Sequence, residues 1–279
     1  LAYIYDHGME RGVSPGWPSL AQLYTVRPGE MTIITGIPNH GKSFFISAMC
    51  VNLAQQQDWH IALFSPENYP LERYAALLME QYTGRPFDGL GRMEPDEKAR
   101  AEAWLQEHVS FLMPEDDAPT VTQLLALAQV QVYRHGIKGL VLDPWNEIEH
   151  SRSGVLSESE YIGQSLTMIR RWGRHHGVHV WVIAHPTKMR KAERGTFDGK
   201  YPPPTPYDIA GSANFRNKAD NCLCVWRDSE ANTRQVDIYV QKVRFREIGH
   251  VGNIALTFEP SCGRYHETRH EDRAFGGVA

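Results

Sequence analysis

A glycine-rich segment near the start of the chain carries a lysine and a serine at a defined spacing. Residues 36–43 read Gly-Ile-Pro-Asn-His-Gly-Lys-Ser and match the pattern G-x-x-x-x-G-K-[ST]. In such a loop, backbone N–H groups cradle phosphates, the lysine reaches the β- and γ-oxygens, and the hydroxyl holds Mg²⁺. The alternative is a plain glycine turn. We expect ATP or another NTP and Mg²⁺ as cofactors, with Lys42 catalytic and Ser43 a metal ligand. The expected nucleotide-binding residues are Gly36, Pro38, Asn39, His40, Gly41, Lys42, Ser43 and Phe44.

Two acidic residues follow apolar runs further along the chain. Asp143 ends the run at 139–142, and Glu67 comes shortly after the run at 61–64. A carboxylate at a strand end can hold Mg²⁺ through water, and a second one can polarise the attacking water as general base. We expect Asp143 in the first role and Glu67 in the second. The alternatives are an Asp that only ends a strand and a Glu at a helix N-terminus.

A histidine and a set of cations follow the run at 179–184. An imidazole at the end of that strand, His185, could hydrogen-bond the γ-phosphate and act in catalysis, although a lone strand-end histidine is often structural. The basic segment after it predicts contact with a phosphodiester backbone. A solvated loop is the alternative. The cations in question are Lys188, Arg190, Lys191, Arg194 and Lys200.

A second pair of cations lies late in the chain. Lys242 and Arg244 are two residues apart, which places both side chains on the same face of a strand. Such a pair could reach the γ-phosphate bound to a neighbouring subunit and act catalytically there, with the arginine as a finger. Edge cations that only deter aggregation are the alternative.

Alternating strand and helix patterns must position these groups. Capping boxes at Thr120 and Ser157 begin helices that Gly136 and Gly177 end. The alternation predicts an α/β fold with a mostly parallel twisted sheet between helices, and ligands at the carboxyl ends of its strands. A C-terminal antiparallel pair should extend the sheet, and the proline-rich segment at 186–206 should be a long loop. The expected strands are 31–35, 60–65, 109–113, 139–143, 179–185, 221–227, 233–243 and 252–259.

The overall composition is that of a globular protein. The 279 residues are 42% hydrophobic and 22% charged, with no run long enough to span a membrane and no signal peptide. The four cysteines lack paired zinc-ribbon spacings, so we expect structural thiols in a reducing compartment. A net charge of −4 gives no general reason to expect a nucleic-acid ligand, although a local basic surface could supply one. The chain begins at Leu1, so we expect a piece of a longer protein.

Taken in order, these motifs resemble the RecA-like motor domain of DnaB-like replicative helicases (superfamily 4), especially the phage primase–helicase and Twinkle branch. The resemblance extends from about Pro15 to Glu259. Beyond the groups above it includes the segment 208–220, in which Gly211, Ser212, Arg216 and Asp220 agree with a helicase motif. It implies a RecA-like P-loop NTPase fold and ATP-dependent translocation on single-stranded DNA, with Arg216 joining the basic segment in DNA binding.

The resemblance also implies partners and boundaries. A homo-hexamer is expected for the full-length parent, and it stays open whether a primase module precedes this chain or a primase binds it. No membrane partner is expected, and the cytoplasm or nucleoid of a bacterial or phage-infected cell is the expected location. The expected division is an N-terminal extension or linker remnant at 1–14, the ATPase domain at 15–265 and a tail at 266–279. The rival interpretations are a RecA- or RadA-like or clock-type ATPase without unwinding activity, and a small-molecule P-loop kinase.

Overall fold

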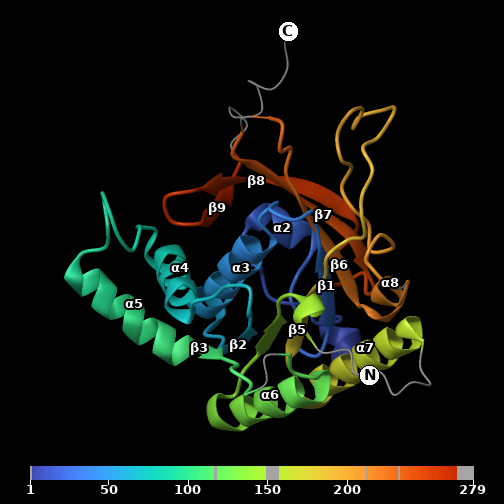
Figure 1. Ribbon diagram of the computed structural model, residues 1–279. Coiled ribbons are helices and arrows are strands. Elements are labelled where there is room, and N and C mark those ends of the chain that lie inside the picture. The colour runs from blue at the N-terminus through green and yellow to red at the C-terminus, as the bar shows by residue number, and fades with distance from the viewer. Residues whose placement is uncertain (1, 116–117, 149–156, 212, 232, 269–279) are drawn as a thin grey trace.

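A single sheet organises the chain in the computed structural model, which describes residues 2–115, 118–148, 157–211, 213–231 and 233–268. Within that part of the chain, nine strands lie in the order β3-β2-β4-β5-β1-β6-β7-β8-β9 (Figure 1). Neighbouring strands from β3 to β6 are parallel, and β7, β8 and β9 continue the sheet as antiparallel strands. The strands are β1 (Met31–Thr35), β2 (Ile61–Phe64), β3 (Val109–Phe111), β4 (Gly139–Leu142), β5 (His179–Ile183), β6 (Asn221–Trp226), β7 (Gln235–Val243), β8 (Gly252–Glu259) and β9 (Arg264–Glu267).

Helices cover both faces of the sheet, because the central strands are apolar on both sides. All five residues of β1 are buried. Ile34 packs in the core on the α3 and α4 side, whereas its neighbour Ile33 packs on the α6 and α7 side. The helical elements are α1 (Ala2–His7), α2 (Pro18–Leu23), α3 (Lys42–Gln57), α4 (Leu71–Thr83), α5 (Pro95–His108), α6 (Val121–His135), the 3₁₀ turn η1 (Trp145–Glu147), α7 (Glu158–His176) and α8 (Asn214–Lys218).

The predicted helix ends are confirmed. The hydroxyls of Thr120 and Ser157 accept hydrogen bonds from the backbone N–H groups of Gln123 and Glu160. Gly136 and Gly177 end their helices at φ 64° and 63°, in the left-handed region that glycine adopts at low cost. These caps fix where the chain re-enters the sheet as β4 and β5.

The C-terminal part differs from the prediction in one respect. The antiparallel pair is present, but a further strand, β9, pairs with β8 and crosses the expected boundary at residue 265. Four mostly polar residues after a turn give no alternating apolar signal, so the sequence pattern missed this strand. The remainder of the expected tail, 269–279, and Ser212 of the helicase-like motif lie outside the described residues.

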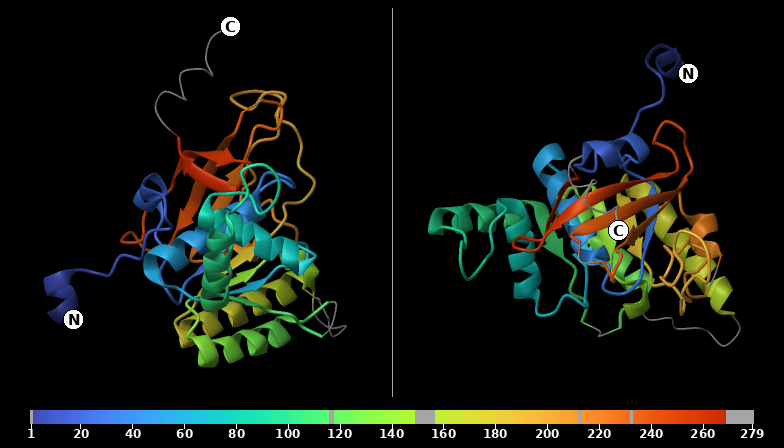
Figure 2. Two further views of the ribbon diagram at one scale, coloured as in Figure 1. Left: turned by 90° about the vertical axis from the view of Figure 1, so that its left-hand side faces the viewer. Right: turned by 90° about the horizontal axis from the view of Figure 1, so that it is seen from above.

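Two segments stand apart from the layers. The segment between β5 and α8 contains isolated bridges but no helix or strand among its described residues, as its prolines predict. α1 projects away from the other elements in both views of Figure 2, so the expected extension at 1–14 carries a short helix. Among the described residues, no helix is both long and apolar enough to cross a bilayer.

Candidate nucleotide site

The glycine loop lies between β1 and the first turn of α3, at the carboxyl end of the central strand. Gly36, Asn39 and Gly41 adopt positive φ values of 154°, 65° and 93°. A Cβ on Gly36 would come 2.3 Å from the carbonyl oxygen of Val225 in β6, so only glycine lets the loop pass this strand. The sequence motif therefore forms the expected strand, loop and helix N-terminus.

Lys42 is anchored at the mouth of this loop. Its Nζ donates hydrogen bonds to the carbonyl oxygens of Gly36 at 2.8 Å and Ile37 at 3.2 Å. Burial lowers the pKa of Lys42, and the nearby carboxylates of Asp143 and Glu67 partly oppose that shift. The ammonium is therefore held near phosphate oxygens by the loop that would bind them.

Asp143 follows β4 directly and is 2% exposed. Burial raises the pKa of its carboxyl to about 6, while the hydroxyls of Ser43 and Ser65 lower it. Its Oδ2 is buried and has no hydrogen-bond partner in the described part of the chain. A buried carboxylate oxygen without a donor, beside a serine hydroxyl, suits a hard cation that prefers oxygen ligands. Ser43 and Asp143 thus fit the Mg²⁺ that the motif implies.

Glu67 and His185 face each other across the site. Glu67 lies in the turn after β2, and its Oε1 is 3.8 Å from His185 Nε2. Burial and the charge of Lys42 lower the pKa of His185, and its Nδ1 has no partner among the described residues. Both side chains border a cavity of about 570 Å³, large enough for the phosphates of a nucleoside triphosphate. Its lining residues are Pro38, Asn39, Gly41, Lys42, Ser43, Phe44, Glu67, Asn68 and His185.

The predicted pair Lys242 and Arg244 does not join this cavity. Lys242 Nζ donates to the carbonyl oxygens of Arg216 at 2.6 Å and Ala219 at 2.7 Å. Arg244 forms an ion pair at 2.9 Å with Asp220, whose side chain is fully buried. Arg244 follows the residue of β7 that pairs with the first residue of β6, at the amino end of the parallel strands. The glycine loop lies at the carboxyl end of the same strands. The rise of four residues along β6 therefore separates Arg244 from the glycine loop by roughly 13 Å.

The predicted DNA-binding cations divide into two groups. Lys188, Arg190 and Arg194 are exposed, and none of them forms an ion pair within the described part of the chain. Lys191 and Lys200 form ion pairs with Glu230 at 2.7 Å and Asp228 at 2.6 Å, and Arg216 donates to the hydroxyl of Tyr207 at 3.0 Å. The first group is therefore available to a ligand without breaking an ion pair, whereas the other three would first have to release a partner.

Two residues that support the site were missed by sequence reasoning. Ser65 interacts with the Asp143 carboxyl, and its position just after an apolar run before Glu67 was the available signal. The hydroxyl of Tyr265 in β9 donates to the carbonyl oxygen of Gly41 at 3.1 Å. No local pattern could identify Tyr265, because it reaches the loop from 224 residues away.

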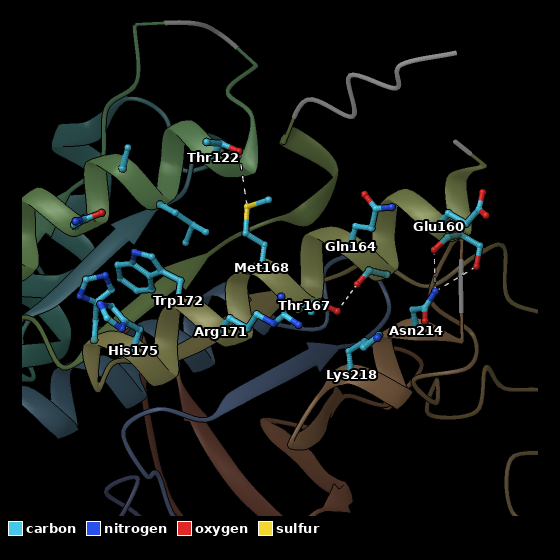
Figure 3. Close-up of a pocket in the computed structure, with 16 residues that line it drawn as sticks. Thr122, Glu160, Gln164, Thr167, Met168, Arg171, Trp172, His175, Asn214 and Lys218 are labelled. Carbon is cyan, nitrogen blue, oxygen red and sulfur yellow. Dashed lines mark hydrogen bonds between the residues drawn. The ribbon is translucent and has the colours of Figure 1, made fainter. Parts of the chain in front are cut away.

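A second, larger cavity lies elsewhere. It measures about 950 Å³ and runs along α6 and α7 to α8, where Figure 3 shows Met168, Trp172 and Thr122 on facing helices. None of the glycine-loop residues and neither Glu67 nor Asp143 lines it. The larger of the two cavities is therefore not the one that holds the candidate catalytic residues.

Comparisons with known proteins identify the family of the chain. A family model described as an AAA domain matches residues 23–191. The chain is 39% identical over 276 residues to a Twinkle homolog protein, chloroplastic/mitochondrial, of Arabidopsis thaliana, which confirms the expected resemblance to Twinkle. The match covers 95% of this chain but 38% of that relative, so the chain spans about two fifths of the relative's length. The relative's name places it in chloroplasts and mitochondria, which lends no support to the expected bacterial or phage-infected cell.

Solved structures confirm the expected fold. One that is described as an ATPase domain superimposes with a TM-score of 0.76 at 18% identity, covering 96% of this chain and 97% of that one. A DnaB-like replicative helicase, described with its interactions with primase, has a TM-score of 0.75 at 16% identity and covers 96% and 67% of the two chains. The mixed sheet with its antiparallel extension is therefore the architecture of DnaB-like ATPase domains.

Proposed function

The chain belongs to the AAA domain family, and we propose that it is the NTP-hydrolysing motor of a replicative DNA helicase. One observation carries the proposal. A single cavity brings together the ammonium of Lys42, the hydroxyl of Ser43 and the carboxylate of Glu67, with Asp143 buried beside them. These are the groups that phosphoryl transfer to water requires.

The roles follow from the geometry. The loop N–H groups and Lys42 would bind the β- and γ-phosphates, and Ser43 and Asp143 would hold Mg²⁺, which neutralises charge on the phosphate oxygens when bound. Glu67 accepts a proton from the attacking water. Its neighbour His185, kept neutral by burial, can orient Glu67 or donate a hydrogen bond toward the γ-phosphate.

We further propose that the catalytic cation at the γ-phosphate comes from a second subunit. Arg244 lies at the end of the sheet opposite to its own glycine loop, so it cannot serve that loop. In a closed ring, each subunit would present its amino-end surface to the next subunit's phosphates. A homo-hexamer satisfies this arrangement, with Lys242 positioned beside Arg244.

We propose that the protein translocates along single-stranded DNA. The cations Lys188 and Arg190 follow shortly after His185, so the basic segment begins at the nucleotide cavity. A focused basic loop can bind phosphates despite a net charge of −4. A primase is a proposed partner, because a solved structure of the same fold is described with one.

One assay tests the proposal. ATP hydrolysis is measured with and without single-stranded DNA, and particle size is measured with a non-hydrolysable ATP analogue. We expect stimulation by DNA, a six-subunit particle and unwinding of a forked duplex, with hydrolysis and unwinding lost in Lys42→Ala. Stimulation without unwinding would favour the RecA- or RadA-like ATPase instead, and phosphoryl transfer to a metabolite would favour a kinase.

A further inference from the structure

A tryptophan lies between the nucleotide loop and the basic segment. Trp226 is the last residue of β6 and is 7% exposed. Its ring meets the ring of His40 edge-on, with centroids 6.4 Å apart. His40 is a residue of the glycine loop and is itself 6% exposed. The end of β6 thus contacts the loop through a side chain as well as through the close approach of Gly36.

A hydrogen bond fixes this contact. His40 Nδ1 accepts the backbone N–H of Arg227 at 3.0 Å. Burial lowers the pKa of His40 to about 4, so the imidazole is neutral and Nδ1 keeps its lone pair near pH 7. His40 of the glycine loop therefore contacts both Trp226, at the end of β6, and Arg227, the residue after it.

The other side of Trp226 contacts the basic segment. Its Nε1 donates to the carbonyl oxygen of Tyr201 at 2.9 Å, and its ring packs edge-on against Phe197 at 5.3 Å. The residues that follow β6 extend the attachment. Lys200 pairs with Asp228 at 2.6 Å and Lys191 pairs with Glu230 at 2.7 Å.

We propose that Trp226 is a positioning residue that couples the state of the nucleotide loop to the position of the basic segment at 186–206. The inference rests on the proposed function for the meaning of that segment, but the coupling itself requires no DNA. A buried aromatic ring packed between two loops transmits a shift of one to the other, because close-packed side chains move together. A shift of His40 on phosphate binding would thus reach Tyr201 and Phe197.

The test uses Trp226→Phe, which keeps a buried ring but removes the N–H bonded to Tyr201. Trp172→Phe is the matched control, because Trp172 lies on α7 in the groove of Figure 3, away from the glycine loop. Trypsin cleavage within 186–206 of the full chain is followed with and without a non-hydrolysable ATP analogue and Mg²⁺. Binding of a fluorescent ATP analogue is titrated with and without a dT oligonucleotide.

In wild type and Trp172→Phe, the ATP analogue is expected to change the cleavage rate at least about fivefold, the lower end of the range typical of coupled sites. In Trp226→Phe this response should fall to less than about half of that, while the nucleotide Kd stays close to that of wild type. Phe197→Leu, which alters the contact from the loop side without touching the core, should reduce the response in the same direction. Unaltered nucleotide dependence of cleavage in Trp226→Phe, or none in wild type, would overturn the inference.

The oligonucleotide arm separates this inference from the proposed function. DNA should change the nucleotide Kd by about tenfold in wild type, within the usual range of coupled sites, and by less than about twofold in Trp226→Phe. If the cleavage response depends on Trp226 but the oligonucleotide never binds, the coupling holds and the DNA motor is wrong. If DNA coupling is the same in wild type and Trp226→Phe, the motor holds and the role of Trp226 is wrong.

Discussion

Replacing Asp143 with asparagine is expected to stabilise the nucleotide-free chain at pH 8 while abolishing Mg²⁺-dependent hydrolysis. Burial raises the pKa of this carboxyl from 3.8 to about 6, so the folded protein holds a carboxylate that would be better solvated in the unfolded chain. At about 1.36 kcal/mol per pH unit, that difference corresponds to roughly 3 kcal/mol. Asparagine has the same shape and no charge to desolvate.

The pH dependence has a definite sign. Below about pH 4 the carboxyl is protonated in the folded and unfolded states, so it contributes no difference. Between about pH 4 and 6 the folded state binds more protons, and the free energy of unfolding of wild type falls as pH rises. Above about pH 6 the full cost is present, and it is absent at every pH in Asp143→Asn.

Urea unfolding without Mg²⁺ or nucleotide, from about pH 4 to pH 8, measures this difference. The variant's gain should grow from none at the acid end to at most about 3 kcal/mol at the basic end, or about 5 °C in Tm for 279 residues. Asp228→Asn is the control of opposite sign, because Lys200 lowers the pKa of that carboxyl. It should be neutral or slightly destabilising. An Asp143→Asn variant that is less stable than wild type at the basic end would refute the reasoning.

Three further substitutions test the site. Glu67→Gln should lower kcat at least about 100-fold, as loss of a general base does, with the nucleotide Kd little changed; kcat within about tenfold of wild type would exclude that role. Arg244→Ala should stop turnover in the assembled ring while nucleotide still binds, and should lower the free energy of unfolding by about 1–2 kcal/mol through loss of its bond to buried Asp220. Normal turnover of Arg244→Ala in an assembled ring would show that Arg244 does not act on the nucleotide of a neighbouring subunit. Tyr265→Phe deletes the hydrogen bond to the glycine loop and should weaken binding of a fluorescent ATP analogue about fivefold, the equivalent of about 1 kcal/mol. An unchanged Kd would show that β9 does not support the loop.

The core of the site is predictable from local pattern, because its residues follow strands that share one edge of the sheet. Strand β1 has the predicted bounds, and the glycine loop follows it without interruption. Asp143 and Glu67 lie beside the loop because β4 and β2 are parallel to β1 and end at the same edge. An apolar run followed by an acidic residue therefore indicates, from the sequence alone, a carboxylate at the edge of the sheet where ligands bind.

What the sequence could not supply was the set of partners from distant segments. The carbonyl oxygens that accept from Lys242 belong to residues 216 and 219. Because every residue has a backbone carbonyl, the sequence does not indicate which ones Lys242 binds. Edge strand β3 ends two residues before the predicted limit, since propensity does not register where pairing stops. The cations at 191 and 200 have acidic partners 39 and 28 residues away, which no local pattern indicates.

The attachment of β9 to the glycine loop has a consequence for synthesis on the ribosome. The backbone carbonyl of Tyr265 accepts the indole N–H of Trp17, and its hydroxyl reaches Gly41, so one of the last described residues joins two of the first segments to be made. A nascent chain can form the early strands while residue 265 is still in the exit tunnel, but it cannot yet make these two bonds. The growing polypeptide therefore gains the hydrogen bond that supports its phosphate-binding loop only after residue 265 has been translated and has left the tunnel.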